Sequence, residues 1–282
     1  MAEQLPDQIE KLPGGSIIQH GPYNDRIYLM KLGDRVPASL PADLIALARR
    51  HKYSKVFLKI PSAHAAPFAR AGYAEEAAVP GLYNGSGPGI FMGFYLNELR
   101  AVESNAAALD EILQLALDKC ESRVTPLDGD RFLLRRCAEG DVEAMAAIYG
   151  AIFPTYPFPI HDPSFLLQSM KSHVDYFGVE RQGALIALAA AELDRSAQNA
   201  EMTDFATLSE WRGNGLGVQL LLRMGKEMQQ KGVRTAYTIA RANSAGMNIT
   251  FAKLGYSYGG RLKNNTNISG NIESMNIWYK TG

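Results

Sequence analysis

A glycine-rich loop between a predicted strand and a predicted helix most constrains the fold of this chain. Residues 200–217 read AEMTDFATLSEWRGNGLG, and apolar periodicity predicts a helix over residues 218–230. Glycine accepts positive φ, so such a loop can turn several N–H groups inward around an anion. The first N–H groups of the helix are unpaired and lie at the positive end of its dipole. The sequence therefore predicts a binding site for a phosphorylated cofactor.

The spacing of the glycines argues against two common nucleotide loops. A dinucleotide fingerprint counted from Gly213 requires a third glycine where Val218 stands. A Walker loop requires Gly-Lys followed by Ser or Thr, and the one Gly-Lys pair of this chain is followed by glutamate within the predicted helix. The pattern that does occur is R-x-x-G-x-G, at Arg212, Gly215 and Gly217.

Composition indicates a soluble globular protein. The chain has 282 residues, enough for about two domains, and is 46% hydrophobic and 21% charged. Its 29 basic and 29 acidic residues balance, so no net field would attract nucleic acid or an anionic membrane. The N-terminus lacks an apolar signal segment, and Cys120 and Cys137 have no metal-ligand spacing. We expect a cytoplasmic protein with reduced thiols and no metal.

The predicted elements form an N-terminal α/β domain (residues 1–100), a connecting helix (residues 101–125) and a C-terminal α/β domain (residues 126–282). The first domain is expected to contain strands at residues 26–32, 55–60 and 89–96 and helices at residues 41–51 and 65–71. The second is expected to contain strands at residues 132–137, 176–180, 184–193, 202–208, 236–240, 256–262 and 274–279 and helices at residues 142–153, 164–172, 218–230 and 247–254.

A short internal repeat links the two domains. Residues 68–73 read FARAGY and residues 251–256 read FAKLGY, each after an apolar strand. The repeat suggests that the first hundred residues echo the second half of the C-terminal domain. The N-terminal copy lacks the glycine loop, because residues 33–41 hold one glycine and two prolines, which have no N–H to donate. We expect the N-terminal domain to bind no cofactor and to serve as a wall or a homodimer surface.

The element order over residues 131–280 and the R-x-x-G-x-G pattern resemble the GNAT superfamily of acetyltransferases. The resemblance implies an α/β fold with a mixed (α+β) sheet, preceded by a degenerate half-GNAT-like domain without a CoA loop. It also implies acetyl-CoA as co-substrate, with its pantetheine arm between two strands that splay apart. The implied cofactor-binding residues are Phe205, Ala206, Thr207, Arg212, Gly213, Asn214, Gly215, Leu216, Gly217, Asn243, Asn248 and Phe251.

Three segments are similar to the β-lysine N-acetyltransferases, a family that the resemblance covers over its full length. They are residues 20–32 (HGPYNDRIYLMKL), 153–166 (FPTYPFPIHDPSFL) and 264–280 (NNTNISGNIESMNIWYK). This resemblance implies acetyl transfer to the ε-amino group of β-lysine, a product of lysine aminomutase, which gives the compatible solute Nε-acetyl-β-lysine. The alternatives are another small diamine, polyamine or amino acid as acceptor, or a non-catalytic acyl-CoA-binding regulatory module.

Acetyl transfer to an ammonium group, with a pKa of ~10.4, requires a base. Glu201, on the strand before the glycine loop, resembles the glutamate base of some GNAT members. Asp204 is the alternative candidate for the base. The two have opposite parity, so they face opposite sides of a regular strand unless a bulge intervenes. The residue at the family's usual tyrosine acid position is Phe251, which has no proton to give. Tyr256, Tyr258 or a water molecule are the substitutes.

A zwitterionic diamine requires amide or cationic donors beside acids. The proline- and aromatic-rich loop supplies Tyr156 and His161 as candidate substrate-binding residues, and the last two strands supply Asn264, Asn265 and Glu273. Two arginines near these strands, Arg241 and Arg261, are expected to be solvated or to contact the phosphates of CoA.

Overall fold

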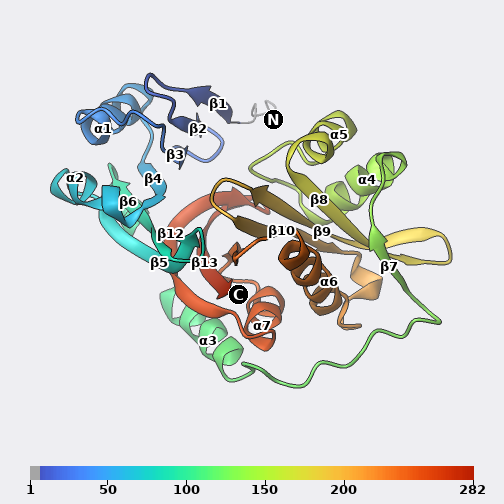
Figure 1. Cartoon of the computed structure of the whole chain (residues 1–282). Coiled ribbons are helices and arrows are strands. Elements are labelled where there is room, and N and C mark those ends of the chain that lie inside the picture. The colour runs from blue at the N-terminus through green and yellow to red at the C-terminus, as the bar shows by residue number, and fades with distance from the viewer. Residues whose placement is uncertain (1–6) are drawn as a thin grey trace.

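The computed structural model describes residues 7–282, and the strands of this range form one mixed 13-stranded sheet (Figure 1). The strand order is β1-β2-β3-β4-β6-β5-β12-β13-β11-β10-β9-β8-β7. The N-terminal half contains β1 (Gln8–Lys11), β2 (Ile17–Gly21), β3 (Arg26–Lys31), α1 (Leu40–His51), β4 (Lys55–Pro61), α2 (Ala65–Arg70), β5 (Ala74–Tyr83) and β6 (Gly87–Tyr95).

The linking helix is α3 (Ala106–Leu117), and the C-terminal half follows it. This half contains β7 (Leu133–Arg136), α4 (Val142–Ile152), α5 (Pro163–Ser172), β8 (Val174–Arg181), β9 (Ala184–Asp194), β10 (Asn199–Thr207), α6 (Leu216–Gln230), β11 (Thr235–Arg241), α7 (Ala245–Lys253), β12 (Ser257–Ile268) and β13 (Asn271–Thr281). The mixed α/β fold is therefore as predicted. None of the helices in residues 7–282 is long and apolar enough to cross a membrane.

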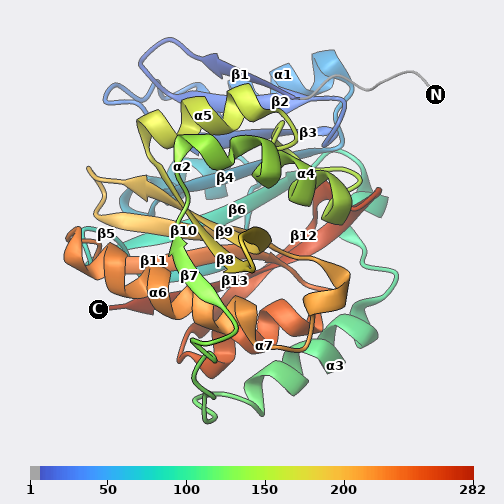
Figure 2. The same cartoon turned by 90° about the vertical axis from the view of Figure 1, so that its right-hand side faces the viewer.

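Helices cover both faces of the C-terminal part of the sheet (Figure 2). Successive residues of β9 alternate between two cores. Leu188 and Ala190 pack in a core with residues of α4 and α5, whereas Ala187 and Ala189 pack in a core with residues of α6 and α7. This two-sided burial explains why β9 reads as a continuous apolar run. Helix α3 lies against α7.

The two halves repeat one topology. The N-terminal order β1-β2-β3-β4-β6-β5 matches the C-terminal order β8-β9-β10-β11-β13-β12. In each half one parallel strand pair, β3/β4 or β10/β11, flanks a crossover helix, α1 or α6. The FARAGY and FAKLGY segments form the ends of α2 and α7 and lead into the equivalent strands β5 and β12. The repeat is thus more extensive than the sequence indicated, because it covers six strands and includes β8 and β9.

Three strands, β1, β2 and β5, were missed in the sequence. Strand β5 reads AEEAAVPGLY, a composition rich in alanine and glutamate that has low β propensity, and it is a strand because β6 and β12 pair with it. Strand β1 is exposed along its whole length, so no apolar alternation marks it. The strand predicted over residues 256–262 extends to Ile268 as β12 and so includes the asparagine-rich segment.

The halves meet where β5 pairs with β12. Gly260 lies opposite Ala77 with a φ of +137°, and a Cβ added to it would lie 2.4 Å from the Glu76 carbonyl oxygen, so this position requires glycine. Beside this contact the fully buried Lys55 ammonium lies 2.9 Å from the Glu76 carboxylate and donates to the Lys263 carbonyl oxygen at 2.8 Å. The joint between the halves therefore includes a buried ion pair.

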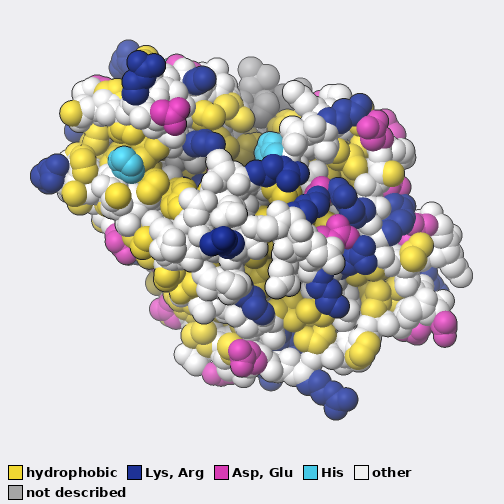
Figure 3. Space-filling model, viewed as in Figure 1, with side chains coloured by type: hydrophobic (Ala, Val, Ile, Leu, Met, Phe, Trp, Pro, Cys, Tyr) yellow, Lys and Arg dark blue, Asp and Glu magenta, His cyan; other side chains and the backbone are white. Residues whose placement is uncertain are grey.

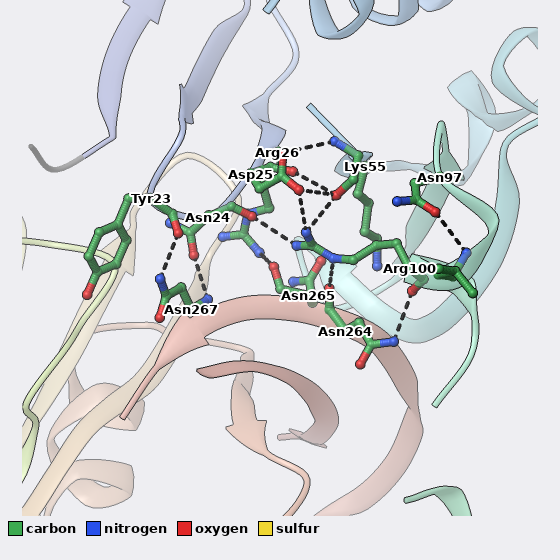
Figure 4. A network of polar contacts seen from close by, with 12 residues as sticks. Tyr23, Asn24, Asp25, Arg26, Lys55, Asn97, Arg100, Asn264, Asn265 and Asn267 are labelled. Carbon is green, nitrogen blue, oxygen red and sulfur yellow. Dashed lines mark hydrogen bonds and ion pairs between the residues drawn. The ribbon is translucent and has the colours of Figure 1, made fainter. Parts of the chain in front are cut away.

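A second group of polar contacts surrounds Arg100 (Figure 4). Its guanidinium donates to the Asp25 carboxylate at 3.1 Å, to the Asn24 carbonyl oxygen at 2.9 Å and to the Asn264 carbonyl oxygen at 2.6 Å. Asn264 in turn donates to the Arg100 and Val102 carbonyl oxygens. These contacts fix the start of β3 against β12.

We predict that Glu76→Gln destabilises the protein by about 3 kcal/mol, because it leaves the Lys55 ammonium buried without a counter-charge. Urea denaturation at pH 7 measures the change. The matched control is Glu75→Gln, since Glu75 is the exposed neighbour and its replacement should change the free energy of unfolding by less than about 0.5 kcal/mol. Equal stabilities of the two variants would contradict a structural role for the buried pair.

Candidate active site between the two halves

A cavity of about 1350 Å³ lies between the N-terminal and C-terminal halves. The N-terminal half lines it from β3 and β4, and the C-terminal half lines it from β9, β10, β11, the glycine loop and α7. The sheet curls enough for β2 to reach the loop before α5, where the Gln19 side chain donates to the Pro157 carbonyl oxygen at 3.0 Å. Both halves therefore enclose one space.

Lys and Arg side chains are frequent across the middle of the face in Figure 3.

The glycine loop has the conformation of an anion site. Gly213 and Gly215 have φ of +83° and +70°, and α6 begins at Leu216, two residues earlier than predicted. Within residues 7–282 no backbone acceptor pairs with the N–H groups from Gly213 to Val218, and a Cβ added at either left-handed glycine would meet no atom within 4 Å. The loop thus presents free N–H groups to open space.

The equivalent loop of the N-terminal half is filled by the turn between β1 and β2. The Gly33 amide donates to the Ser16 hydroxyl at 3.0 Å, and the Arg35 amide donates to the Gly14 carbonyl oxygen at 3.3 Å. A Cβ on Gly33 would lie 2.1 Å from that same Gly14 oxygen. The turn between β1 and β2 therefore occupies the place that an anion would need.

Strands β10 and β11 separate partway along their length. Their parallel pairing runs from Asn199 opposite Thr235 to Glu201 opposite Tyr237 and stops there. Both strands then continue, β10 to Thr207 and β11 to Arg241, and both line the cavity. The strands expected to splay apart therefore do so, and the opening leads from the glycine loop into the cavity.

A bulge in β10 brings both candidate bases into the cavity. The pairing with β9 shifts register between Thr203 and Ala206, and Asp204 has a φ of +56°. The bulge cancels the parity rule that would place Glu201 and Asp204 on opposite faces, and both line the cavity. Asp204 accepts hydrogen bonds from the Tyr156 hydroxyl and, at 3.1 Å, from the Thr203 hydroxyl.

A third carboxylate, Glu192 on β9, lies directly opposite Glu201 in the strand register. Burial, followed by the charges of Glu201 and Asp204, raises the pKa of Glu192 to about 8. Burial also raises the pKa of Glu201, against the opposing effects of Lys59 and of a hydrogen bond with Tyr237. Burial raises the pKa of Asp204, against the hydrogen bond from Tyr156. Three acids therefore share one poorly solvated space.

A cation of the N-terminal half balances part of this charge. Lys59 on β4 donates from Nζ to the Tyr237 hydroxyl at 2.6 Å, and its ammonium lies 5.1 Å from the centre of that ring. Because the Tyr237 hydroxyl also interacts with Glu201, Tyr237 links Lys59 to Glu201. Lys59 is thus a basic group that the N-terminal half adds to the acids of the C-terminal half.

The structure brings many of the predicted site residues together around the cavity and leaves others outside it. Those that line the cavity are Tyr156, Glu201, Asp204, Phe205, Thr207, Arg212, Gly213, Gly215, Leu216, Gly217, Phe251 and Asn265. Those that do not line it are Ala206, Asn214, Asn243, Asn248, Tyr256, His161, Asn264 and Glu273.

Several residues outside the cavity have structural contacts. Asn248 is fully buried and donates to the Ser244 carbonyl oxygen at 2.8 Å, while its own oxygen accepts from Asn276 and Trp278. Tyr256 packs edge-on against Phe251 in the core.

The other polar side chains outside the cavity are paired or exposed. Glu273 binds Arg241 at 2.7 Å, and Arg261 binds Asp110 of α3 at 2.8 Å. Asn264 belongs to the Arg100 group, and His161 is exposed. The Asn214 side chain donates to the Trp211 carbonyl oxygen at 3.0 Å and so braces the glycine loop.

Sequence analysis did not identify Glu192, Lys59 or Arg26 as site residues, although all three line the cavity. A signal was present for two of them. Glu192 ends the apolar run of β9, and Lys59 interrupts the apolar strand KVFLKIP. Charged residues in such runs are seldom buried without a partner or a function. Arg26 gives no comparable signal, because it is the first residue of its strand.

We predict that Glu192→Gln changes the pH dependence of stability. Because the pKa of Glu192 rises from 4.5 to about 8 on folding, its contribution to stability is present below the unfolded pKa and is lost as the pH rises through 8. Wild type and variant should have similar free energies of unfolding at pH 4, and the variant should be the more stable by at least about 1 kcal/mol at pH 8. Urea denaturation at both pH values measures this, with exposed Glu143→Gln as control. A pH-independent difference would contradict the raised pKa.

Known proteins resemble this chain along nearly its whole length. The sequence model of the acetyltransferase (GNAT) family matches residues 143–256. The Beta-lysine N(6)-acetyltransferase of Methanococcus maripaludis is 40% identical over 265 residues, which are 94% of this chain and 96% of the relative. The N-acetyltransferase YodP of Bacillus subtilis is 30% identical over 94% of this chain and 95% of its own. The Beta-lysine N(6)-acetyltransferase of Methanosarcina mazei is 40% identical over 53% of this chain and 55% of its own. The protein is therefore an acetyltransferase that belongs to the GNAT family.

Proposed function

We propose that the protein transfers the acetyl group of acetyl-CoA to the N6 amino group of β-lysine. The observation that carries this proposal is the 40% identity to the Methanococcus maripaludis β-lysine enzyme, which extends over 94% of the chain and so includes both walls of the cavity. β-Lysine has two ammonium groups and one carboxylate, and acetylation removes one positive charge. The product is a zwitterion without net charge, which suits a compatible solute.

The geometry supports acetyl-CoA as the donor. We place its diphosphate on the free N–H groups of residues 213–218, where the loop and the start of α6 attract anions. The pantetheine arm then passes into the opening between β10 and β11, and the thioester reaches the bulge of β10. Backbone N–H groups near Ala206 stabilise the developing oxyanion, since they are fixed dipoles that need little reorganisation.

The cavity also suits a diamine acceptor. Glu192, Glu201 and Asp204 place three acidic groups in the cavity, where they can bind the two ammonium groups of the acceptor. We propose Glu201 as the base that removes a proton from the N6 ammonium before attack on the thioester. Asp204 is less suited, because it already holds two hydroxyl groups through one carboxylate oxygen. The leaving thiol has a pKa of ~8.5, so its departure does not depend on a strong acid.

The proposal is tested by incubating the purified protein with acetyl-CoA and each of β-lysine, α-lysine and spermidine. Release of CoA is followed by a thiol reagent, and the acetylated product is located by mass spectrometry. We expect the highest kcat/KM with β-lysine and acetylation at N6. Preference for spermidine or α-lysine, or acetylation at the β-amino group, would contradict the assignment. Tight acetyl-CoA binding without turnover of any amine would identify an acyl-CoA-binding regulatory module instead.

We predict that Gly215→Val weakens acetyl-CoA binding about 10-fold or more, because a β-branched residue cannot adopt the left-handed conformation that exposes the loop amides. Isothermal calorimetry measures the dissociation constant. Gly232→Val is the matched control, since Gly232 has a similar φ of +80° and equally open surroundings but lies at the far end of α6. Its replacement should destabilise the fold to a similar extent and leave acetyl-CoA affinity unchanged. Equal affinities for both variants would place the diphosphate elsewhere.

We predict that Glu201→Gln lowers kcat by at least about 100-fold, because general base catalysis contributes this much or more. Its acetyl-CoA affinity should remain that of the wild type. Asp204→Asn should reduce kcat less, since the amide oxygen can still accept the Tyr156 hydroxyl. Steady-state kinetics with β-lysine compares the two variants. A larger loss in kcat for Asp204→Asn would transfer the role of base to Asp204.

A further inference from the structure

An arginine without an acidic partner lines the cavity from the N-terminal half. Arg26 begins β3 and is 4% exposed. Its Nη1 donates to the Asn265 carbonyl oxygen and, at 3.1 Å, to the Thr266 hydroxyl (Figure 4). In the described part of the chain no carboxylate oxygen lies within 4.0 Å of its guanidinium, whereas nearby Arg100 pairs with Asp25 at 3.1 Å.

The guanidinium keeps one edge without an acceptor. Nε of Arg26 is buried and has no hydrogen-bond partner, and its Nη2 donates to no residue in the range 7–282. Nε and Nη2 together form an edge that binds a carboxylate through two parallel hydrogen bonds. The protein thus uses Nη1 to hold the guanidinium in place and leaves this edge unused.

Burial of an unpaired guanidinium is costly for the fold. The rings of Tyr28 and Phe57 lie 5.4 and 5.5 Å from its central carbon, so aromatic faces replace water around it. Burial lowers the pKa of Arg26 to about 10, and the side chain stays charged at neutral pH. A buried guanidinium without a protein counter-ion, beside a substrate cavity, indicates that the ligand supplies the counter-ion.

The position of Arg26 fits an acceptor that spans the cavity. Alternate residues of β3 face the cavity, so Arg26 and Tyr28 share one side of the strand. Tyr28, whose ring lies 5.4 Å from the central guanidinium carbon of Arg26, lines the cavity together with Glu201. A ligand with an ammonium group at one end and a carboxylate at the other can contact both.

Asn265 adds an acceptor next to the guanidinium. Its side-chain oxygen is buried and has no hydrogen-bond partner among residues 7–282. The residue lines the cavity, and its backbone oxygen already binds Arg26. A β-amino acid has its ammonium group only two carbons from the carboxylate carbon. A cation and an amide oxygen side by side therefore match this end of the molecule.

We propose that Arg26 binds the carboxylate of the acceptor, and that the N-terminal half thereby selects amino acids over plain diamines. This inference rests on the proposed acceptor class and adds a substrate-binding role for the N-terminal half. Lys59 is not the carboxylate-binding group, because its ammonium is already held by Tyr237 near Glu201.

The test compares β-lysine with 1,4-diaminopentane, which is β-lysine without its carboxylate. For Arg26→Gln we expect kcat/KM with β-lysine to fall about 100-fold, mainly through KM, because a buried charge-assisted contact is lost. With 1,4-diaminopentane the variant should stay within about threefold of the wild type. Arg26→Lys should recover only part of the β-lysine activity, since lysine keeps the charge and lacks the two-point edge.

Two controls separate binding from folding. Acetyl-CoA affinity of Arg26→Gln should equal that of the wild type, and Arg70→Gln, which removes an exposed arginine of α2, should change neither acceptor. Equal losses with both acceptors would overturn the inference, because they would show a structural role for Arg26. Unchanged selectivity would overturn it as well.

A binding measurement separates this inference from the proposed function. If the wild type acetylates neither acceptor, the proposed function fails. Calorimetry with β-alanine in the presence of CoA then still tests whether Arg26 binds a carboxylate. Binding of β-alanine to the wild type and its loss in Arg26→Gln would support a carboxylate site, whereas equal binding or no binding to the wild type would overturn it.

Discussion

The cavity exists because buried polar contacts hold the N-terminal half against β12. The backbone pairing between β5 and β12 has a single registered pair, Gly260 opposite Ala77, which is short for a junction between two halves of a sheet. The Lys55–Glu76 ion pair and the contacts of Arg100 lie beside it and bind both halves through side chains. Buried charges of this kind are costly to break, so the junction is fixed even though its ladder is short. The position of β3 and β4 relative to β10 follows from this arrangement.

That position determines the chemistry of the site. Glu192, Glu201 and Asp204 come from β9 and β10, whereas Arg26 and Lys59 come from β3 and β4. The N-terminal half thus adds cations to a cavity whose acids come from the C-terminal half. The enclosing walls also exclude water, which raises the pKa values of the carboxylates and strengthens their interaction with an ammonium group. A zwitterionic diamine fits this arrangement, since its N6 ammonium and its carboxylate lie at different ends.

The sequence predicted the parts of the structure that depend on local pattern. Glycines at positions 213 and 215 predicted a left-handed loop before a helix, and the prolines of residues 33–41 predicted its absence in the other half. The parity of Glu201 and Asp204 was a sound argument for a regular strand, but the bulge that overrides it has no signature in this stretch of residues. The sequence could not predict that Arg26 holds its guanidinium through Nη1 and leaves its Nε–Nη2 edge without an acceptor. This arrangement depends on contacts with Asn265 and Thr266, which are about 240 positions away. Long-range contacts, rather than local propensity, supply the acceptor end of the site.

The repeated topology explains how one fold supplies both ends of the acceptor site. Strands β3 and β10 occupy equivalent places in the two halves, and the same side of each faces the shared cavity. In the C-terminal half the loop after β10 stays open and offers its amides to an anion. In the N-terminal half Gly14 and Ser16 fill the equivalent loop, so the loop after β3 offers no free amides to a phosphate group. Its cavity-facing residues are therefore free to carry Arg26 and Tyr28, while those of β10 carry Glu201 and Asp204. Two equivalent strands with opposite charges, facing one enclosed space, form a site for a molecule that is itself charged with both signs.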